Sequence, residues 1–92
     1  MIGSFRHKGL KDFFETGSMR GISPDLALRI ARRLDVVEAA QESGDIDAHG
    51  FNLHRLKGDR HGEWAISVSG NWRITFRFAK GEALDLNLED YH

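Results

Sequence analysis

The run WAISVSGNWRITFRFAKGEALDLNL, from Trp64 to Leu88, decides the fold that the sequence predicts. Apolar and polar residues alternate in three segments of this run, and a period of two is typical of strands that are buried on one face. Residues 69–70 (SG) and 80–82 (KGE) separate the segments and are typical of turns. The run therefore predicts three consecutive antiparallel strands that share one apolar face.

The alternation assigns each side chain of these strands to one of two faces. The residues expected on the apolar face are Trp64, Ile66, Val68, Trp72, Ile74, Phe76, Phe78, Leu84, Leu86 and Leu88. Those expected on the polar face are Asn71, Arg73, Thr75, Arg77, Asp85 and Asn87. The tryptophans and phenylalanines are thus predicted to be core residues rather than a surface on which nucleic-acid bases stack.

Two shorter segments are also predicted to be extended. Residues 51–56 (FNLHRL) alternate, with Phe51 and Leu53 on one face and Asn52 and His54 on the other. Residues 1–5 (MIGSF) are consistent with a short edge strand. If residues 51–56 belong to the same sheet, His54 lies on its polar face.

Helical spacing precedes the strands. Residues 7–17 place Leu10, Phe13 and Phe14 at positions i, i+3 and i+4, and Gly17 closes this first helix. Residues 22–44 predict a longer helix. Its apolar stripe consists of Leu26, Ile30, Leu34 and Val37.

The ends of the longer helix carry capping signals. Ser23 is a suitable N-cap, Pro24 suits the first helical position, and Asp25 complements the positive end of the helix dipole. Gly44 is expected to end the helix. Four charged residues should face water or a partner: Arg29, Arg32, Arg33 and Glu38.

Together these segments predict an α+β domain that spans residues 1–92. Two N-terminal helices are expected to pack on one face of a mostly antiparallel, twisted sheet, which leaves the polar face of the sheet open. A chain of 92 residues is long enough for one modest core.

Composition excludes several classes of function. The chain has no cysteine, which excludes disulfides, thiolate catalysis and cysteine zinc sites and fits a reducing cytoplasm. No apolar run approaches the roughly 18 residues of a membrane span, and no secretory signal is evident. We therefore expect a cytoplasmic protein.

Charge is unevenly distributed along the chain. The net charge is −1, but residues 51–80 hold six Lys or Arg and two acids, a net charge of +4. Residues 81–92 hold four acids and no Lys or Arg, and residues 1–50 hold seven basic and eight acidic residues. A basic middle segment can attract phosphate even in a nearly neutral molecule.

The chain end tests the strand alternation. If the last strand continues past Leu88, Glu89 and Tyr91 point to the polar face, and Asp90 and His92 point to the core. Burying an unpaired Asp is costly, so either the strand should break or twist near Glu89 or the tail should be frayed. Tyr91 is expected beside Arg73 on the polar face.

The polar face therefore gathers groups that RNA strand cleavage requires. A base accepts the proton of the attacking 2′-OH, an acid protonates the leaving 5′-oxygen, and cations stabilise the phosphorane. His54 and His92 have the residue type for proton transfer, and Arg73 and Lys57 that for phosphate binding. Such chemistry needs no metal or other cofactor. His7, His49 and His61 join no cluster and show no metal-ligand spacing.

Three motifs resemble a known family. SFRHKGLKDFFETG (residues 4–17), LHRLKGDRHGEWAISVSGNWRITFRF (residues 53–78) and the terminal EDYH (residues 89–92) resemble the HigB group of bacterial toxin–antitoxin toxins in the RelE superfamily. The likeness runs in register from Ile2 to His92. It implies a RelE-like fold and a ribosome-dependent endoribonuclease that cuts messenger RNA in the ribosomal A site.

The resemblance also implies partners and site residues. The partners are a HigA-like helix-turn-helix antitoxin, the ribosome and messenger RNA, with operator DNA bound only through the antitoxin. The positions that match the family's functional residues are His54, Lys57, Arg73, Asp90, Tyr91 and His92.

Roles within this set are hypotheses. One of His54 and His92 acts as base and the other as acid, while Lys57 and Arg73 stabilise the phosphorane. Tyr91 stacks on or orients the nucleotide. Asp90 orients an imidazole or contacts the RNA backbone.

Two rival interpretations remain. ParE-like toxins share the fold and poison DNA gyrase, but they lack this set of histidine, lysine, arginine and tyrosine. An inactivated toxin that only binds a partner is the other alternative, against which the complete set argues.

Overall fold

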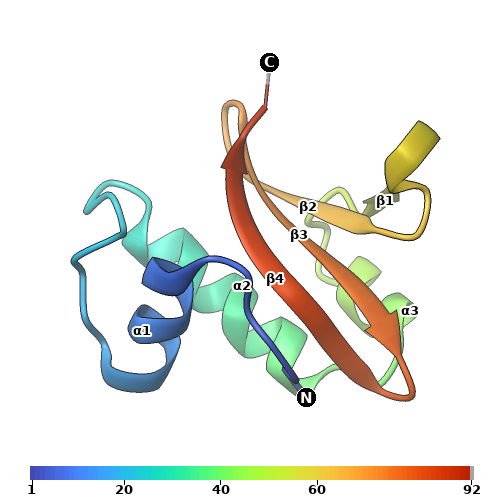
Figure 1. Cartoon of the computed structure of the whole chain (residues 1–92), viewed down its shortest axis with the longest axis horizontal. Helices are drawn as coiled ribbons and strands as arrows, with labels where there is room; N and C mark the ends of the chain where they lie inside the picture. Colours follow the sequence, from blue (N-terminus) through green and yellow to red (C-terminus); the bar gives the residue numbers. More distant parts are fainter. Residues whose placement is uncertain (92) are drawn as a thin grey trace.

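The computed structural model describes residues 1–91, in which three α-helices accompany one four-stranded sheet (Figure 1). The elements are α1 (Lys8–Thr16), α2 (Ala27–Ala39), α3 (Ser43–Asp47), β1 (His54–Arg55), the 3₁₀ helix η1 (Gly58–Arg60), β2 (Trp64–Ser69), β3 (Trp72–Ala79) and β4 (Glu82–Asp90). The strands pair in the order β1-β2-β3-β4, and each pair is antiparallel. The predicted α+β class and the meander of strands are confirmed.

A single apolar cluster joins the helices to the sheet. The predicted stripe of α2 is buried, and Leu10 of α1 is buried with it. From the strands, the cluster contains Ile66, Val68, Ile74, Phe76, Ala83, Leu86 and Leu88. Burial of each large apolar side chain stabilises the fold by about 1.5–3 kcal/mol. In the part of the chain that the structure describes, no helix has the length and apolar character that crossing a membrane requires.

The first helix follows its prediction closely. Gly17 adopts φ 77° as the C-cap of α1, a left-handed conformation that glycine reaches without strain. At the other end, Nδ1 of His7 accepts a hydrogen bond from the backbone N–H of Leu10 at 2.9 Å. His7 therefore acts as the N-cap, a role that the sequence reading did not assign.

The prediction of a single helix over residues 22–44 is wrong. Residues 23–26 form a turn, in which Leu26 N–H donates to Ser23 O at 3.0 Å, and α2 starts only at Ala27. The chain leaves the helix at the buried residue Ala40, which is extended. The carboxylate of Asp45 then accepts hydrogen bonds from two backbone N–H groups at residues 41–42. This local cap starts α3, so Gly44 lies inside a third helix and does not end the second.

The strand predicted over residues 51–56 is reduced to β1. Asn52 has φ 58°, a left-handed conformation that asparagine tolerates better than most residues. This residue breaks the alternation, although Ser67 N–H still donates to Phe51 O at 2.9 Å. The predicted N-terminal edge strand is present only as two isolated parallel bridges to β4, Ile2 with Ala83 and Phe5 with Leu86.

A bulge in β4 changes which residues face the core. The register moves from Thr75 opposite Asn87 to Arg77 opposite Leu84, and Asp85 between them has φ 56°. An extra residue shifts the alternation by one position. Ala83 is therefore fully buried in place of Leu84, which lies opposite Arg77.

Two residues of β3 also depart from the predicted faces. Trp72 is 36% exposed because it pairs with Ser69 and Asp90 at the end of the sheet, beyond the helices. Thr75 is fully buried although it lies on the polar face. A loop that folds back over this face covers it, and that loop is part of the site described next.

Candidate functional site

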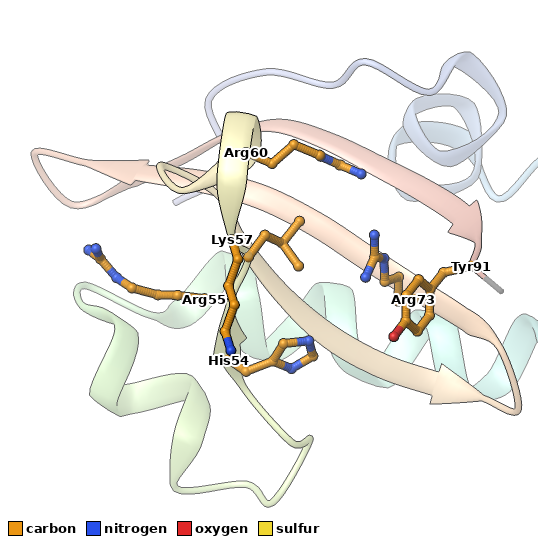
Figure 2. A pocket seen from close by; sticks show the side chains of 7 residues that line it. His54, Arg55, Lys57, Arg60, Arg73 and Tyr91 are labelled. Carbon is orange, nitrogen blue, oxygen red and sulfur yellow. The ribbon is translucent and has the colours of Figure 1, made fainter.

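An open hollow of about 410 Å³ lies on the polar face of the sheet (Figure 2). We call it the basic hollow, because four of its seven lining residues are Lys or Arg. The lining residues are His54, Arg55, Leu56, Lys57, Arg60, Arg73 and Tyr91. They come from β1, from the loop and 3₁₀ helix that follow it, from β3 and from the end of β4. Four of the six residues predicted for the site thus meet here.

His54 is held in one tautomer by its own loop. Its Nδ1 lies 2.8 Å from the backbone carbonyl of Asn52. A carbonyl oxygen only accepts, so Nδ1 carries the hydrogen in this contact. The neutral ring then has its lone pair on Nε2, and Figure 2 shows the ring turned toward Arg73 and Tyr91. This arrangement leaves an exposed nitrogen that can accept a proton.

Arg73 and Tyr91 form a stacked pair. The guanidinium carbon of Arg73 lies 4.1 Å from the centroid of the Tyr91 ring, within the range of a cation–π contact. The backbone N–H of Tyr91 donates to Asn71 O at 2.9 Å, which fixes the chain just after β4. The prediction that both side chains share the polar face is confirmed. Of the alternatives expected near Glu89, a break of the strand does not occur, since β4 continues through Asp90.

Lys57 is placed by the turn that follows β1. It immediately precedes the 3₁₀ helix η1, and its carbonyl accepts from Arg60 N–H at 3.4 Å. Gly58 has φ 67°, so a residue with a side chain would be strained in this turn. Lys57 is exposed, and Figure 2 shows its side chain reaching toward His54. Arg55 points away and stacks on Trp64 at 4.7 Å.

Behind the basic hollow, two arginines and two glutamates form an ion-pair network. Arg60 binds Glu63 through Nε at 2.9 Å and Nη2 at 3.0 Å. It also binds Glu89 through Nη1 at 2.8 Å and Nη2 at 3.2 Å. Arg73 donates from Nε to the same Glu89 at 2.8 Å. The network crosses three segments: the loop after η1, β3 and β4.

The network shifts the pKa of three of its members. Hydrogen bonds from Arg60 lower the pKa of Glu63 below its usual range, although burial opposes them. Burial raises the pKa of Glu89, but hydrogen bonds from Arg60 and Arg73 outweigh it, and the net pKa is lowered. Hydrogen bonds to Glu63 and Glu89 raise the pKa of Arg60. Arg60, Glu63 and Glu89 are therefore charged at neutral pH.

Of the other two predicted residues, one lies outside the basic hollow and the other outside the described part of the chain. Asp90 is exposed, pairs with Trp72 in the β3–β4 register and does not line the basic hollow. His92 lies outside the described residues. The histidines expected outside the site have local contacts instead: His49 stacks on Phe51 at 5.9 Å, and Nδ1 of His61 lies 3.1 Å from Gly58 O. Within residues 1–91, no three His, Asp or Glu side chains form a metal-binding cluster.

Sequence reasoning missed the residues of the network. Arg60 and Glu63 stand three positions apart in the loop, and their pairing could have been suggested by that spacing. Glu89 lies directly opposite Arg73, which an antiparallel hairpin with a known turn would have indicated. Neither signal reveals that Arg60 reaches across to Glu89, because that contact depends on how the loop folds back.

A second hollow of about 280 Å³ shares His54, Arg73 and Tyr91 with the first. Its other lining residues are Asn52, Ser67, Gly70, Asn71 and Trp72. The stacked pair of Arg73 and Tyr91 therefore contributes to two adjoining hollows.

Comparisons with known proteins show the family of the chain. Residues 3–92 match the family described as RelE-like toxin of type II toxin-antitoxin system HigB. The chain is 50% identical over 92 residues to the protein named Endoribonuclease HigB from Proteus vulgaris, and the match covers all of both chains. It is 27% identical over 93 residues to Toxin HigB-1 from Vibrio cholerae, with 99% of this chain and 98% of the relative covered.

Proposed function

Because the chain belongs to the HigB-like family of RelE-like toxins from type II toxin–antitoxin systems, we propose that this endoribonuclease toxin cuts messenger RNA in the ribosomal A site. The observation that carries the proposal is the meeting of His54, Lys57, Arg73 and Tyr91 around one basic hollow. Cleavage there would stop translation of the bound message.

The reaction we propose is an internal transfer. The 2′-oxygen forms a bond to the adjacent phosphorus and loses its proton to a base, while the bond to the 5′-oxygen breaks and an acid supplies a proton to that oxygen. The products are a cyclic phosphate and a free 5′-hydroxyl. Because the RNA carries its own nucleophile, the protein has to supply proton transfer and charge stabilisation only.

His54 and His92 share the proton transfers in this proposal. In the neutral ring of His54, Nδ1–H is bound to Asn52 O and Nε2 is available, which suits the base. His92 then acts as the acid. Each such group contributes on the order of 10²–10⁴-fold in rate.

Arg73 and Lys57 stabilise the negative charge on phosphorus. The guanidinium offers several N–H donors in a plane, and the lysine offers a mobile point charge. Tyr91 keeps Arg73 in place by stacking and presents its exposed ring to a nucleotide. Asp90 is proposed to orient an imidazole or to contact the RNA backbone near the site.

The partners follow from the family and from charge. A type II toxin has an antitoxin partner, and we propose a HigA-like helix-turn-helix protein through which alone operator DNA is bound. The net charge of +4 over residues 51–80 is proposed to dock on ribosomal RNA, so binding should weaken as salt is raised. These partners place the protein in the bacterial cytoplasm.

The test uses untagged protein and ribosomes programmed with a short message, with a transfer RNA in the P site. New 5′ ends are mapped for the unchanged protein, for His54→Ala and for Arg77→Ala, a control on β3 outside the basic hollow. We expect A-site cuts that His54→Ala abolishes and Arg77→Ala retains. Growth arrest with a DNA-damage response and no cleavage would instead support a gyrase poison.

A further inference from the structure

The carboxylate of Glu89 lies between Arg60 and Arg73 of the basic hollow and contacts both of them. We propose that Glu89, itself held by Arg60, is a positioning residue that fixes the guanidinium of Arg73 for the transition state. This inference rests on the proposed cleavage of RNA and assigns Glu89 and Arg60 a part in it. Both residues act through Arg73 and need not touch the substrate.

Glu89 holds Arg73 by one edge only. Both Nε, at 2.8 Å, and Nη2, at 2.7 Å, contact the same oxygen, Oε1. Tyr91 covers one face of the guanidinium. The Nη1 group has no partner among residues 1–91, so it remains able to bind a phosphate oxygen. Arg73 is thus fixed along one edge and one face and has donors left for substrate.

Glu89 is in turn fixed from the other side. Nη1 of Arg60 donates to Oε1 at 2.8 Å, Nη2 donates to Oε2 at 3.2 Å, and the amide of Asn87 also donates to Oε2 at 3.2 Å. The two oxygens are therefore saturated with donors. A carboxylate held by three side chains has little freedom to rotate, and it transmits that rigidity to Arg73.

Arg60 lines the basic hollow but is committed to this network. Its Nε and Nη2 bind Glu63, which is buried, and Nη2 lies 3.5 Å from the hydroxyl of the buried Thr75. With Nη1 on Glu89, every nitrogen of its guanidinium is engaged. Of the two network arginines, only Arg73 has an unused end, so Arg60 is an anchor and not a phosphate ligand.

The net charge of the ion-pair network allows a positioning role of Glu89 to be distinguished from simple attraction of RNA. The network contains two arginines and two glutamates, so its net charge is zero. Replacing Glu89 by glutamine makes the basic hollow more positive. Attraction alone would then bind RNA more tightly and leave the cleavage rate intact. A positioning role predicts the opposite for the rate, because a loosened guanidinium must be ordered during the reaction.

Single-turnover cleavage on programmed ribosomes distinguishes the positioning role of Glu89 from simple attraction of RNA. We expect Glu89→Gln to lower the maximal rate about 10- to 100-fold, the range that follows from a misplaced group, without raising the half-saturating toxin concentration. In the Arg73→Ala background, Glu89→Gln should have no further effect. The matched control is Asp85→Asn, which removes a carboxylate from the same strand, paired to Arg77 at 3.9 Å, and should stay within about twofold.

A rate for Glu89→Gln within about twofold of the unchanged protein would overturn the inference. Additive losses in the double variant would overturn it too, because Glu89 would then act independently of Arg73. If the unchanged protein cuts nothing, the proposed function fails and this inference fails with it, which separates that outcome from the others.

A second measurement protects the test against misfolding of the variant. In the unchanged protein, the Nε–H proton of Arg73 should exchange slowly with water in NMR spectra, because Oε1 of Glu89 holds it. Arg77 Nε–H, 3.9 Å from Asp85 and half exposed, should exchange fast and serves as the reference. Equal exchange at the two arginines would overturn the inference whether or not Glu89→Gln folds.

Discussion

Two arginines of β3 lie in different environments although they occupy equivalent positions. Arg73 and Arg77 are four residues apart on one face, and each has an acid of β4 beside it. Arg73 contacts Glu89 at 2.7 Å and its side chain is 13% exposed. Arg77 lies 3.9 Å from Asp85, and both of these side chains are about half exposed. The same strand thus carries a rigid ion pair and a solvated one.

The difference comes from what lies on the strand. The loop after β1 returns across the sheet at Arg73, where Arg60 contacts Glu89 and Thr75 is buried beneath it. Near Arg77, the bulge at Asp85 shifts the register. The carboxylate of Asp85 lies 3.9 Å from the guanidinium of Arg77. Charge pairs gain strength where water is excluded and have little effect where it is not. The alternation of a strand determines which face a charged residue occupies. The covering loop determines whether that residue forms a rigid or a solvated ion pair.

The largest effect expected from this comparison is on cleavage. Arg73→Ala removes the donor proposed to stabilise the phosphorane and should reduce the cleavage rate on programmed ribosomes about 100- to 1,000-fold. Arg77→Ala should leave the rate within about twofold, since its side chain lies outside the basic hollow. Equal losses in the two variants would mean that both arginines act by general attraction to RNA, and the comparison would fail.

The next effect concerns stability. Arg60→Ala leaves the carboxylates of Glu63 and Glu89 without their shared partner, and Glu63 is only 6% exposed. We expect the free energy of unfolding to fall by about 2–3 kcal/mol, the cost of leaving buried charged groups without hydrogen bonds. Urea denaturation followed by circular dichroism measures it.

The control for this stability prediction is Arg77→Ala, which should cost less than about 0.5 kcal/mol because its ion pair is exposed. If Arg60→Ala proved as stable as Arg77→Ala, the network would not contribute to the fold, and its rigidity would need another source.

Most of the fold follows from local patterns. The strands, their turns, the first helix and the apolar stripe of α2 were predicted because each depends on nearby residues only. The errors occur where one backbone conformation changes the pattern. The left-handed residues Asn52 and Asp85 shorten β1 and shift β4, and the cap formed by Asp45 starts α3. Side-chain periodicity does not register such single-residue events.

The candidate site also has a part that could be predicted from the sequence and a part that could not. The meeting of His54, Arg73 and Tyr91 was predicted from the alternation, since strand parity fixes the face of a residue as long as no bulge intervenes. The ion pairs of Arg60 were not, because they depend on a loop whose path no period describes. Asp90 stands beside Tyr91 in the sequence but outside the lining of the basic hollow, and its part in the site stays a prediction.

The pH dependence of stability should report the ion pairs that Glu89 forms. The lowered pKa of Glu89 means that its stabilisation is complete above the ordinary carboxyl pKa and is lost as the pH falls through the lowered value. The free energy of unfolding should therefore fall below about pH 4.5, and less steeply in Glu89→Gln than in the unchanged protein. Equal slopes in the two proteins would show that Glu89 gains nothing from its two arginines.

The smallest expected effect concerns the ring of Tyr91, which distinguishes Arg73 from Arg77. Among the described residues, the Tyr91 hydroxyl has no hydrogen-bond partner, whereas the ring lies 4.1 Å from the guanidinium of Arg73. Tyr91→Phe retains the ring, so its cleavage rate should stay within about threefold, while Tyr91→Ala should lose about tenfold, consistent with one stacking contact. A large loss in Tyr91→Phe would assign the hydroxyl a part in proton transfer, and the stacking role would then be wrong.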